Sequence, residues 1–114
     1  MVDDDQVTRQ FMSDTLRSAR YDVYACDDGE QALVSFARHA PFAVVVVDVL
    51  LPGMRGTQLA EMLARTAPDV RILYVSSRTN APPLAPRRLF LKKPFSAQTF
   101  LAEIEKVVGS AGAP

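Results

Sequence analysis

The stretch FAVVVVD, residues 42–48, constrains the fold more than any other part of the chain. It joins four consecutive valines to a terminal carboxylate, and a β-branched run of this kind favours a strand. Because no polar side chain interrupts the run, both faces of the strand should be buried, as in a parallel sheet covered by helices on both sides. The stretch therefore predicts an α/β fold in which Asp48 ends an inner strand.

Helical and extended patterns alternate around this strand. Such alternation predicts a parallel sheet with right-handed crossovers and helices on both faces. Prolines at positions 82, 83 and 86 predict a loop there. We expect helices at 7–19, at 30–39, from 56 or 57 to before Pro68, and from the Ser96 cap onward, and strands at 21–26, 42–48, 71–76 and 88–93.

Polar side chains stand where the expected strands end. Asp3 and Asp4 follow the first apolar pair, Asp48 ends FAVVVVD, Ser76 ends RILYVS, and Lys93 ends RLFLKK. Since ligands of parallel sheets gather at the carboxyl ends of the strands, we expect these side chains to share one edge. Each alone has an ordinary structural explanation, but together they predict a functional site.

The residue types at this edge suit phosphoryl transfer. Neighbouring carboxylates raise one another's pKa unless a cation neutralises them, and hard oxygen ligands suit Mg²⁺. Asp3 and Asp4 are therefore expected to lie against Mg²⁺, while Asp5 caps the first helix. A carboxylate can attack phosphorus, and Asp48 is the candidate nucleophile. Lys93 and the Ser76 hydroxyl are suited to bind the transferred phosphoryl oxygens.

Composition argues against several other classes. The 114 residues predict one domain, and 13 basic against 13 acidic residues give no electrostatic case for binding nucleic acid or membranes. Cys26 and His39 are each the only residue of their type, so we expect neither a disulfide nor a zinc site. No apolar run is long enough to span a bilayer and no export leader is recognisable, which predicts a soluble, cytoplasmic domain.

Five motifs, read in order, resemble the receiver domain of two-component response regulators: VDDD with Arg9 following, DDGEQAL, VVVVDVLLPGMRG, LYVSS and LKKPF. The pattern is closest to the receivers of hybrid histidine kinases. The resemblance implies a flavodoxin-like (βα)5 fold, a doubly wound parallel sheet of five strands in the order 2-1-3-4-5. We expect the receiver domain at residues 1–108 and a flexible C-terminal tail at 109–114.

Carried over by position, the resemblance implies that Asp48 is the phosphoacceptor and that Mg²⁺ is the cofactor. Asp4 would ligate Mg²⁺ directly and Asp3 through water. Asp48 and the backbone carbonyl of Leu50 would supply further oxygens. Lys93 would be the phosphate-binding lysine.

The resemblance also implies a conformational switch. Ser76 would be the switch hydroxyl, and Phe90 the aromatic residue whose rotamer follows it. The Lys93–Pro94 peptide bond is typically cis in this family, which would aim the lysine into the site.

The function implied is a phosphorelay switch. A histidine kinase or histidine phosphotransfer protein would phosphorylate Asp48, with no direct contact to nucleic acid or membrane; the oligomeric state is left open. At most the chain would catalyse its own Mg²⁺-dependent phosphorylation and dephosphorylation, so it is not expected to be an enzyme. The alternative is a pseudo-receiver that acts as a protein-interaction module without phosphorylation. A hydrolase is disfavoured because Leu50 stands where a second acid–base carboxylate would be needed.

Three departures from the family pattern lead to further expectations. Only Met1 and Val2 precede the acidic pair, which predicts a truncated first strand that lacks ladder hydrogen bonds. The proline-rich segment between Ser76 and Lys93 is short for the family, so its fourth helix is expected to be shortened or missing. Leu50 and Arg78 flank the site at positions that tune hydrolysis in relatives, and we expect a phosphorylated state that decays slowly.

Overall fold

The computed structural model describes residues 1–77, 82 and 87–112, the last three by their backbone alone. Its centre is a parallel sheet of β1 (Val45–Asp48), β2 (Ile72–Ser76) and β3 (Arg88–Lys92), in that order. Both faces of β1 and β2 are buried, as the valine run predicts. Alternate residues face opposite ways, so Val46 and Val47 belong to different core clusters.

Beside β1, the chain start and the segment before Asp27 extend the sheet by single residues. Val2 forms a parallel bridge with Val47 on one side and with Cys26 on the other. The lateral order is therefore Cys26, Val2, β1, β2, β3, which corresponds to the predicted order 2-1-3-4-5. The truncation of the first strand is confirmed, because Val2 alone pairs with both neighbours.

The prediction of a full strand at residues 21–26 is wrong. Only Cys26 pairs, through a hydrogen bond from its N–H to the Met1 carbonyl and one from the Asp3 N–H to its own carbonyl. The amino group of Met1 donates to the Tyr24 carbonyl. A strand needs a partner along its length, and Cys26 is the one residue of 21–26 that forms a bridge to another described residue.

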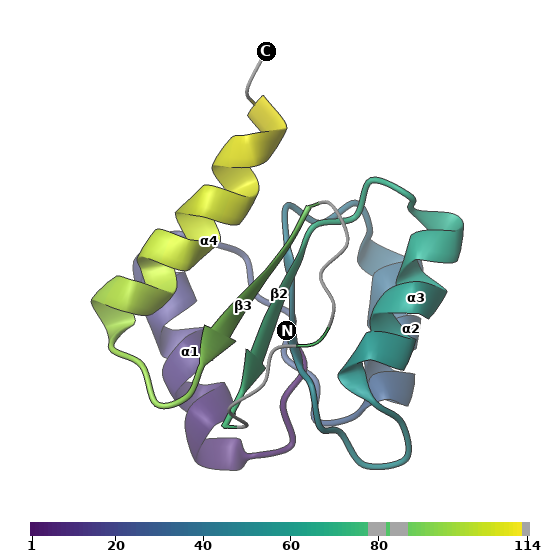
Figure 1. Ribbon diagram of the computed structural model, residues 1–114, viewed down its shortest axis with the longest axis horizontal. Helices are drawn as coiled ribbons and strands as arrows, with labels where there is room; N and C mark the ends of the chain where they lie inside the picture. The colour runs from purple at the N-terminus through teal and green to yellow at the C-terminus, as the bar shows by residue number, and fades with distance from the viewer. Residues whose placement is uncertain (78–81, 83–86, 113–114) are drawn as a thin grey trace.

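Helices cover both faces of the sheet (Figure 1). One pair, α1 (Gln6–Ser18) and α4 (Ala97–Gly112), packs over Met12, Leu73 and Phe100. The other pair, α2 (Gly29–His39) and α3 (Gly56–Thr66), packs over Val47, Leu59 and Tyr74. None of the helices within the described residues has the length and apolar character needed to cross a bilayer.

Three helices begin at side-chain caps that fix the loops beside the carboxyl edge. Asp5 accepts a hydrogen bond from the Thr8 N–H at the start of α1, as predicted. Asp28 does the same for α2 by accepting from the Gln31 N–H, and Ser96 accepts from the Thr99 N–H ahead of α4. The cap of α1 ties the helix directly to the acidic triplet.

Two predictions about the rest of the chain remain predictions. Most of the segment expected to lack a helix, 78–81 and 83–86, lies outside the described residues. Helix α4 is continuous to Gly112, past the expected domain boundary at residue 108, and 113–114 lie outside the described residues.

Candidate functional site

The carboxyl edge of the sheet gathers the predicted site residues. Asp48 ends β1, Ser76 ends β2, and Lys93 directly follows β3. Asp3 follows Val2 on the other side of β1. Asp3 is fully buried and Asp48 is 7% exposed, which is unusual for carboxylates and requires partners for their charge.

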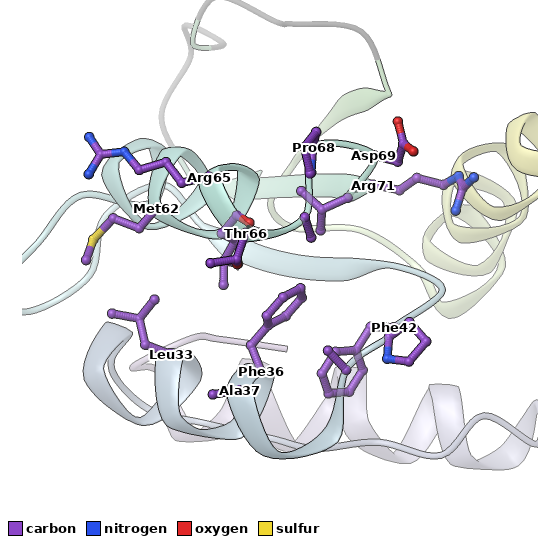
Figure 2. A pocket seen from close by; sticks show the side chains of 15 residues that line it. Leu33, Phe36, Ala37, Phe42, Met62, Arg65, Thr66, Pro68, Asp69 and Arg71 are labelled. Carbon is purple, nitrogen blue, oxygen red and sulfur yellow. Dashed lines mark hydrogen bonds between the residues drawn. The ribbon is translucent and has the colours of Figure 1, made fainter.

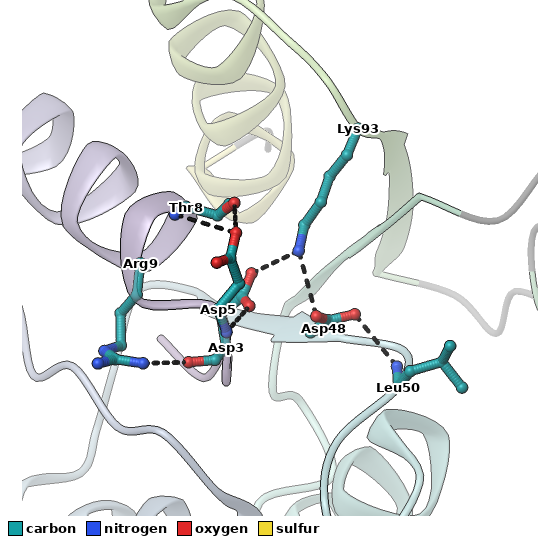
Figure 3. Close-up of polar contacts among 7 residues, drawn as sticks. All are labelled: Asp3, Asp5, Thr8, Arg9, Asp48, Leu50 and Lys93. Carbon is teal, nitrogen blue, oxygen red and sulfur yellow. Dashed lines mark hydrogen bonds and ion pairs between the residues drawn. The ribbon is translucent and has the colours of Figure 1, made fainter.

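Lys93 supplies that partner for both carboxylates (Figure 3). Its Nζ lies 2.7 Å from Oδ2 of Asp3 and 3.1 Å from Oδ2 of Asp48. Burial lowers the pKa of Lys93, but hydrogen bonds and the negative charges of the two aspartates outweigh it, so the net pKa lies above its usual value. Lys93 therefore stays cationic at neutral pH between the two carboxylates.

Asp48 combines burial with a defined orientation. Its Oδ1 accepts a hydrogen bond of 3.1 Å from the Leu50 N–H, while Oδ2 faces Lys93. Burial raises the pKa of Asp48, and the Leu50 N–H and Lys93 oppose that rise. Behind Asp48, Gly56 packs so tightly that a Cβ there would lie 2.1 Å from the Asp48 carbonyl oxygen. The β1–α3 connection thus holds Asp48 in place.

Asp3 is held by its own turn and by helix α1. The Asp5 N–H donates to Oδ1 of Asp3 at 2.9 Å, and Nη1 of Arg9 donates to the Asp3 carbonyl at 2.8 Å (Figure 3). The sequence motif includes Arg9, but sequence reasoning assigned it no role. Its position one turn into α1, on the side of the acidic triplet, is the signal that points to this contact.

Asp3, Asp4 and Asp48 together form a group that fits a divalent cation. One carboxylate oxygen from each lies within 4.8 Å of the others, and Asp4 is exposed while the other two are buried. Mg²⁺ is typically held by one or two carboxylates and keeps several waters, so an exposed third carboxylate suits it. The donor set is chemically right for Mg²⁺. The predicted role of the Leu50 carbonyl stays a prediction, because the structure records only the contact of its N–H.

Ser76 and Phe90, the predicted switch pair, lie on the neighbouring strands β2 and β3. Ser76 is 1% exposed at the end of β2, and its carbonyl accepts from the Lys93 N–H at 2.7 Å. Phe90 pairs with Tyr74 in the β2–β3 register and packs, half-buried, against the core under α3. The Lys93–Pro94 peptide bond is cis, as expected from the resemblance.

These observations define a class: a doubly wound α/β domain with an acidic, lysine-bridged site at the carboxyl ends of its strands. The family model of the response regulator receiver domain matches residues 1–105, and the chain belongs to this family. The finer likeness to receivers of hybrid kinases stays a prediction.

Individual relatives agree with this assignment. The chain is 30% identical to the response regulator receiver protein CpdR of Brucella abortus, covering 97% of this chain and 96% of that protein. It is 31% identical to the response regulator MprA of Mycobacterium leprae, but spans only 49% of its length. Among solved structures, chemotaxis protein CheY4 of Vibrio cholerae superposes with a TM-score of 0.82 at 29% identity, covering 93% of both chains.

Proposed function

We propose that this chain is a phosphoacceptor receiver domain in a two-component phosphorelay, phosphorylated on Asp48 with Mg²⁺ as cofactor. The observation that carries the proposal is the bridging position of Lys93, with Nζ within 3.1 Å of the carboxylates of both Asp3 and Asp48. A lysine between a nucleophile and a metal-binding carboxylate can also bind the negatively charged oxygens of a phosphoryl group that is transferred to the nucleophile. Membership of the receiver family supports the same function.

The phosphoryl donor is a phosphohistidine on a kinase or phosphotransfer protein, or a small acyl phosphate. A carboxylate oxygen of Asp48 forms a bond to phosphorus, and the bond from phosphorus to the donor nitrogen or oxygen breaks. The leaving group keeps the electron pair and takes a proton as its chemistry requires. Burial favours the protonated form of Asp48. The charge of Lys93 and the hydrogen bond from the Leu50 N–H oppose this effect and favour the ionised, nucleophilic form.

Mg²⁺ would be held directly by Asp4, Asp48 and the Leu50 carbonyl and through water by Asp3, and when bound it would supply positive charge that offsets repulsion between the carboxylates and the incoming phosphoryl oxygens. The chain's own part is orientation. Arg9 and the Asp5 N–H fix Asp3, and Gly56 fixes the backbone of Asp48. The protein acts in the cytoplasm, where such donors occur.

The output is a surface change that starts at Ser76. Once Asp48 carries a phosphoryl group, the Ser76 hydroxyl donates to one of its oxygens and Phe90 follows into the vacated space. Moving the population from mostly inactive to mostly active requires a preference of about 5 kcal/mol for one state, and a smaller preference gives graded output. Lys93 and Ser76 together supply contacts of that order.

A pseudo-receiver that only binds proteins is the second candidate. The single-residue pairing of Val2 favours it, because a short central strand holds Asp3 and Asp4 less firmly. The intact set of Asp3, Asp4, Asp48, Ser76 and Lys93 opposes it.

The experiment that separates the two is intact-mass spectrometry after incubation with acetyl phosphate and Mg²⁺. We expect the mass of one phosphoryl group to be gained, and the gain to disappear without Mg²⁺ or in Asp48→Asn. Absence of any gain in a folded sample would leave the interaction module.

The phosphorylated state should decay slowly, because apolar Leu50 beside Asp48 disfavours an attacking water. Leu50 is exposed beside the site, whereas Arg78, the second residue in this prediction, lies outside the described residues. The decay of the mass gain after removal of acetyl phosphate measures this, and a half-life of seconds with Mg²⁺ present would contradict it.

A further inference from the structure

Tyr74, in the middle of β2, has no part in the phosphoryl chemistry proposed above. Its side chain is fully buried in the core cluster that α3 covers. A phenol oxygen taken out of water needs a hydrogen-bond partner, because leaving it unpaired costs free energy. The partner is Arg88, whose Nη1 donates to the Tyr74 hydroxyl oxygen at 3.3 Å. A charged donor thus fixes the far end of a buried ring.

Arg88 stands at the start of β3 and is itself nearly buried. Its side chain is 10% exposed, and the same Nη1 lies 3.4 Å from Oε1 of Glu61 on α3, whose side chain is 69% exposed. One nitrogen of Arg88 therefore connects β3 to both β2 and α3. Water screens the pair with the exposed Glu61, so we expect that contact to be the weaker of the two.

The register of β2 and β3, which lie side by side in Figure 1, shows which way the Tyr74 ring points. Tyr74 is paired with Phe90, the predicted switch residue. Arg88 lies two residues before Phe90 and Ser76 lies two residues after Tyr74, so all four side chains belong to one face of the sheet. Arg88 is nearer the amino edge and Ser76 is at the carboxyl edge. The contact with Arg88 therefore draws the Tyr74 hydroxyl away from Ser76.

Phe90 is half-buried and packs against the same core cluster as Tyr74. We propose that Arg88 is a positioning residue that holds the Tyr74 ring away from Ser76. It thereby keeps the ring out of the space that Phe90 enters when Asp48 is phosphorylated. The inference rests on the proposed function, since it concerns the same switch. Without the contact, the two rings compete for the space beside Ser76, because a close-packed interior does not accommodate both.

The two rings can be followed separately by ¹⁹F NMR of the full chain. The sequence has three tyrosines and six phenylalanines, so labelling with 3-fluorotyrosine or 4-fluorophenylalanine gives few resonances. The variants Tyr74→Phe and Phe90→Leu assign the two that matter. Acetyl phosphate with Mg²⁺ supplies the phosphoryl group, and the intact mass of the same sample reports its occupancy. In wild type we expect the Phe90 resonance to shift in proportion to the mass gain.

Arg88→Met keeps the aliphatic stem but removes the donor. We expect the Tyr74 resonance to move even without phosphorylation. The equilibrium of Phe90 in the phosphorylated protein should change at least about fivefold against the switched position, as loss of one net hydrogen bond implies. Tyr74→Phe, which loses only the hydroxyl, should lower the Phe90 response in the same direction. Glu61→Gln, and Arg87→Met at the exposed neighbouring arginine, should keep the wild-type response.

A second substitution separates this role from a general loss of packing. Tyr74→Leu in the Arg88→Met background removes the competing ring, so the Phe90 response should return in the folded double variant. An unchanged response in both single variants, or a still smaller one in the double variant, would overturn the inference and reject only the role of Arg88. Absence of the mass gain or of the Phe90 shift in wild type would overturn the proposed function, and this inference with it.

Discussion

The two edges of the sheet are built in opposite ways. At the carboxyl edge, Asp3 and Asp48 are almost wholly buried, yet hydrogen bonds from Lys93 and backbone N–H groups satisfy both. At the amino edge, Cys26 is the one residue of 21–26 that forms a bridge to another described residue, and mostly apolar residues surround a pocket of about 820 Å³ between α2 and α3 (Figure 2). One edge is tightly specified by a few polar groups, whereas the other is loosely packed. The side chains whose positions are fixed by several hydrogen bonds therefore lie at the edge where phosphoryl transfer is proposed.

The largest expected effect comes from a steric clash introduced at the carboxyl edge of the sheet. Gly56→Ala places a Cβ 2.1 Å from the Asp48 carbonyl oxygen. The Cβ is fixed directly to the helix backbone and the oxygen belongs to the strand backbone, so neither atom can rotate away. We expect a loss of about 3 kcal/mol in the free energy of unfolding, measured by urea denaturation. Gly109→Ala is the matched control: nothing lies within 4 Å of a Cβ there, so the helix should gain roughly 0.5–1 kcal/mol. Equal stability of Gly56→Ala and wild type would refute the tight packing.

A smaller effect removes the central cation. Lys93→Met leaves Asp3 and Asp48 buried without their ion-pair partner, which should cost about 2–3 kcal/mol at neutral pH in the absence of Mg²⁺. Added Mg²⁺ should restore part of this loss, because it supplies the missing positive charge. Urea denaturation with and without Mg²⁺ measures both changes, and a variant as stable as wild type without Mg²⁺ would contradict the account.

The same variant has a predicted pH dependence. Burial raises the pKa of Asp48 above its usual value, so the folded state binds more protons than the unfolded state just above that value. Stability is therefore lost as pH rises through this window and regained as pH falls. Because Lys93 opposes the rise, Lys93→Met should widen the window. Its stability should increase on acidification from neutral pH more than that of wild type, and the double variant with Asp48→Asn should lose most of the extra slope.

Packing at the amino edge can be tested by lengthening the strand that contains Val2. A short apolar, β-branched extension before Met1 should pair with the backbone before Tyr24 and beside Val44. We expect a gain of about 1–2 kcal/mol in the free energy of unfolding from the added hydrogen bonds and burial. A Gly-Ser extension of equal length is the control and should give no gain. Hydrogen exchange at residues 21–24 should slow only with the apolar extension; equal exchange with both would contradict this description of the edge.

The smallest expected effect comes from removing the hydrogen bond that Arg9 donates to the Asp3 carbonyl. Arg9→Met keeps the aliphatic stem but removes the donor to the Asp3 carbonyl, so the metal-binding turn should be less well ordered. We expect about fivefold weaker Mg²⁺ binding by isothermal titration calorimetry, as the loss of roughly 1 kcal/mol implies. Arg9→Lys should recover part of it, and Arg17→Met should leave it unchanged. An unaltered Mg²⁺ affinity in folded Arg9→Met would remove Arg9 from the site.

Sequence predicts the carboxyl edge far better than the amino edge. Asp48, Ser76 and Lys93 are each marked by the end of an apolar run, so their convergence follows from the parallel topology. The strand expected at residues 21–26 failed because pairing depends on a partner remote in sequence, which no local pattern reports. The contact of Arg9 and the pocket below Phe36 were equally hidden, since both depend on how helices sit on the sheet.

The most direct test of the central claim is to identify the phosphorylated residue itself. After incubation with acetyl phosphate and Mg²⁺, borohydride reduction converts an aspartyl phosphate to homoserine, which peptide mass spectrometry locates in the sequence. The account predicts homoserine in place of Asp48, dependent on Mg²⁺ and greatly reduced in Lys93→Met. Homoserine at Asp3 or Asp4, or at no position in a folded sample, would contradict it.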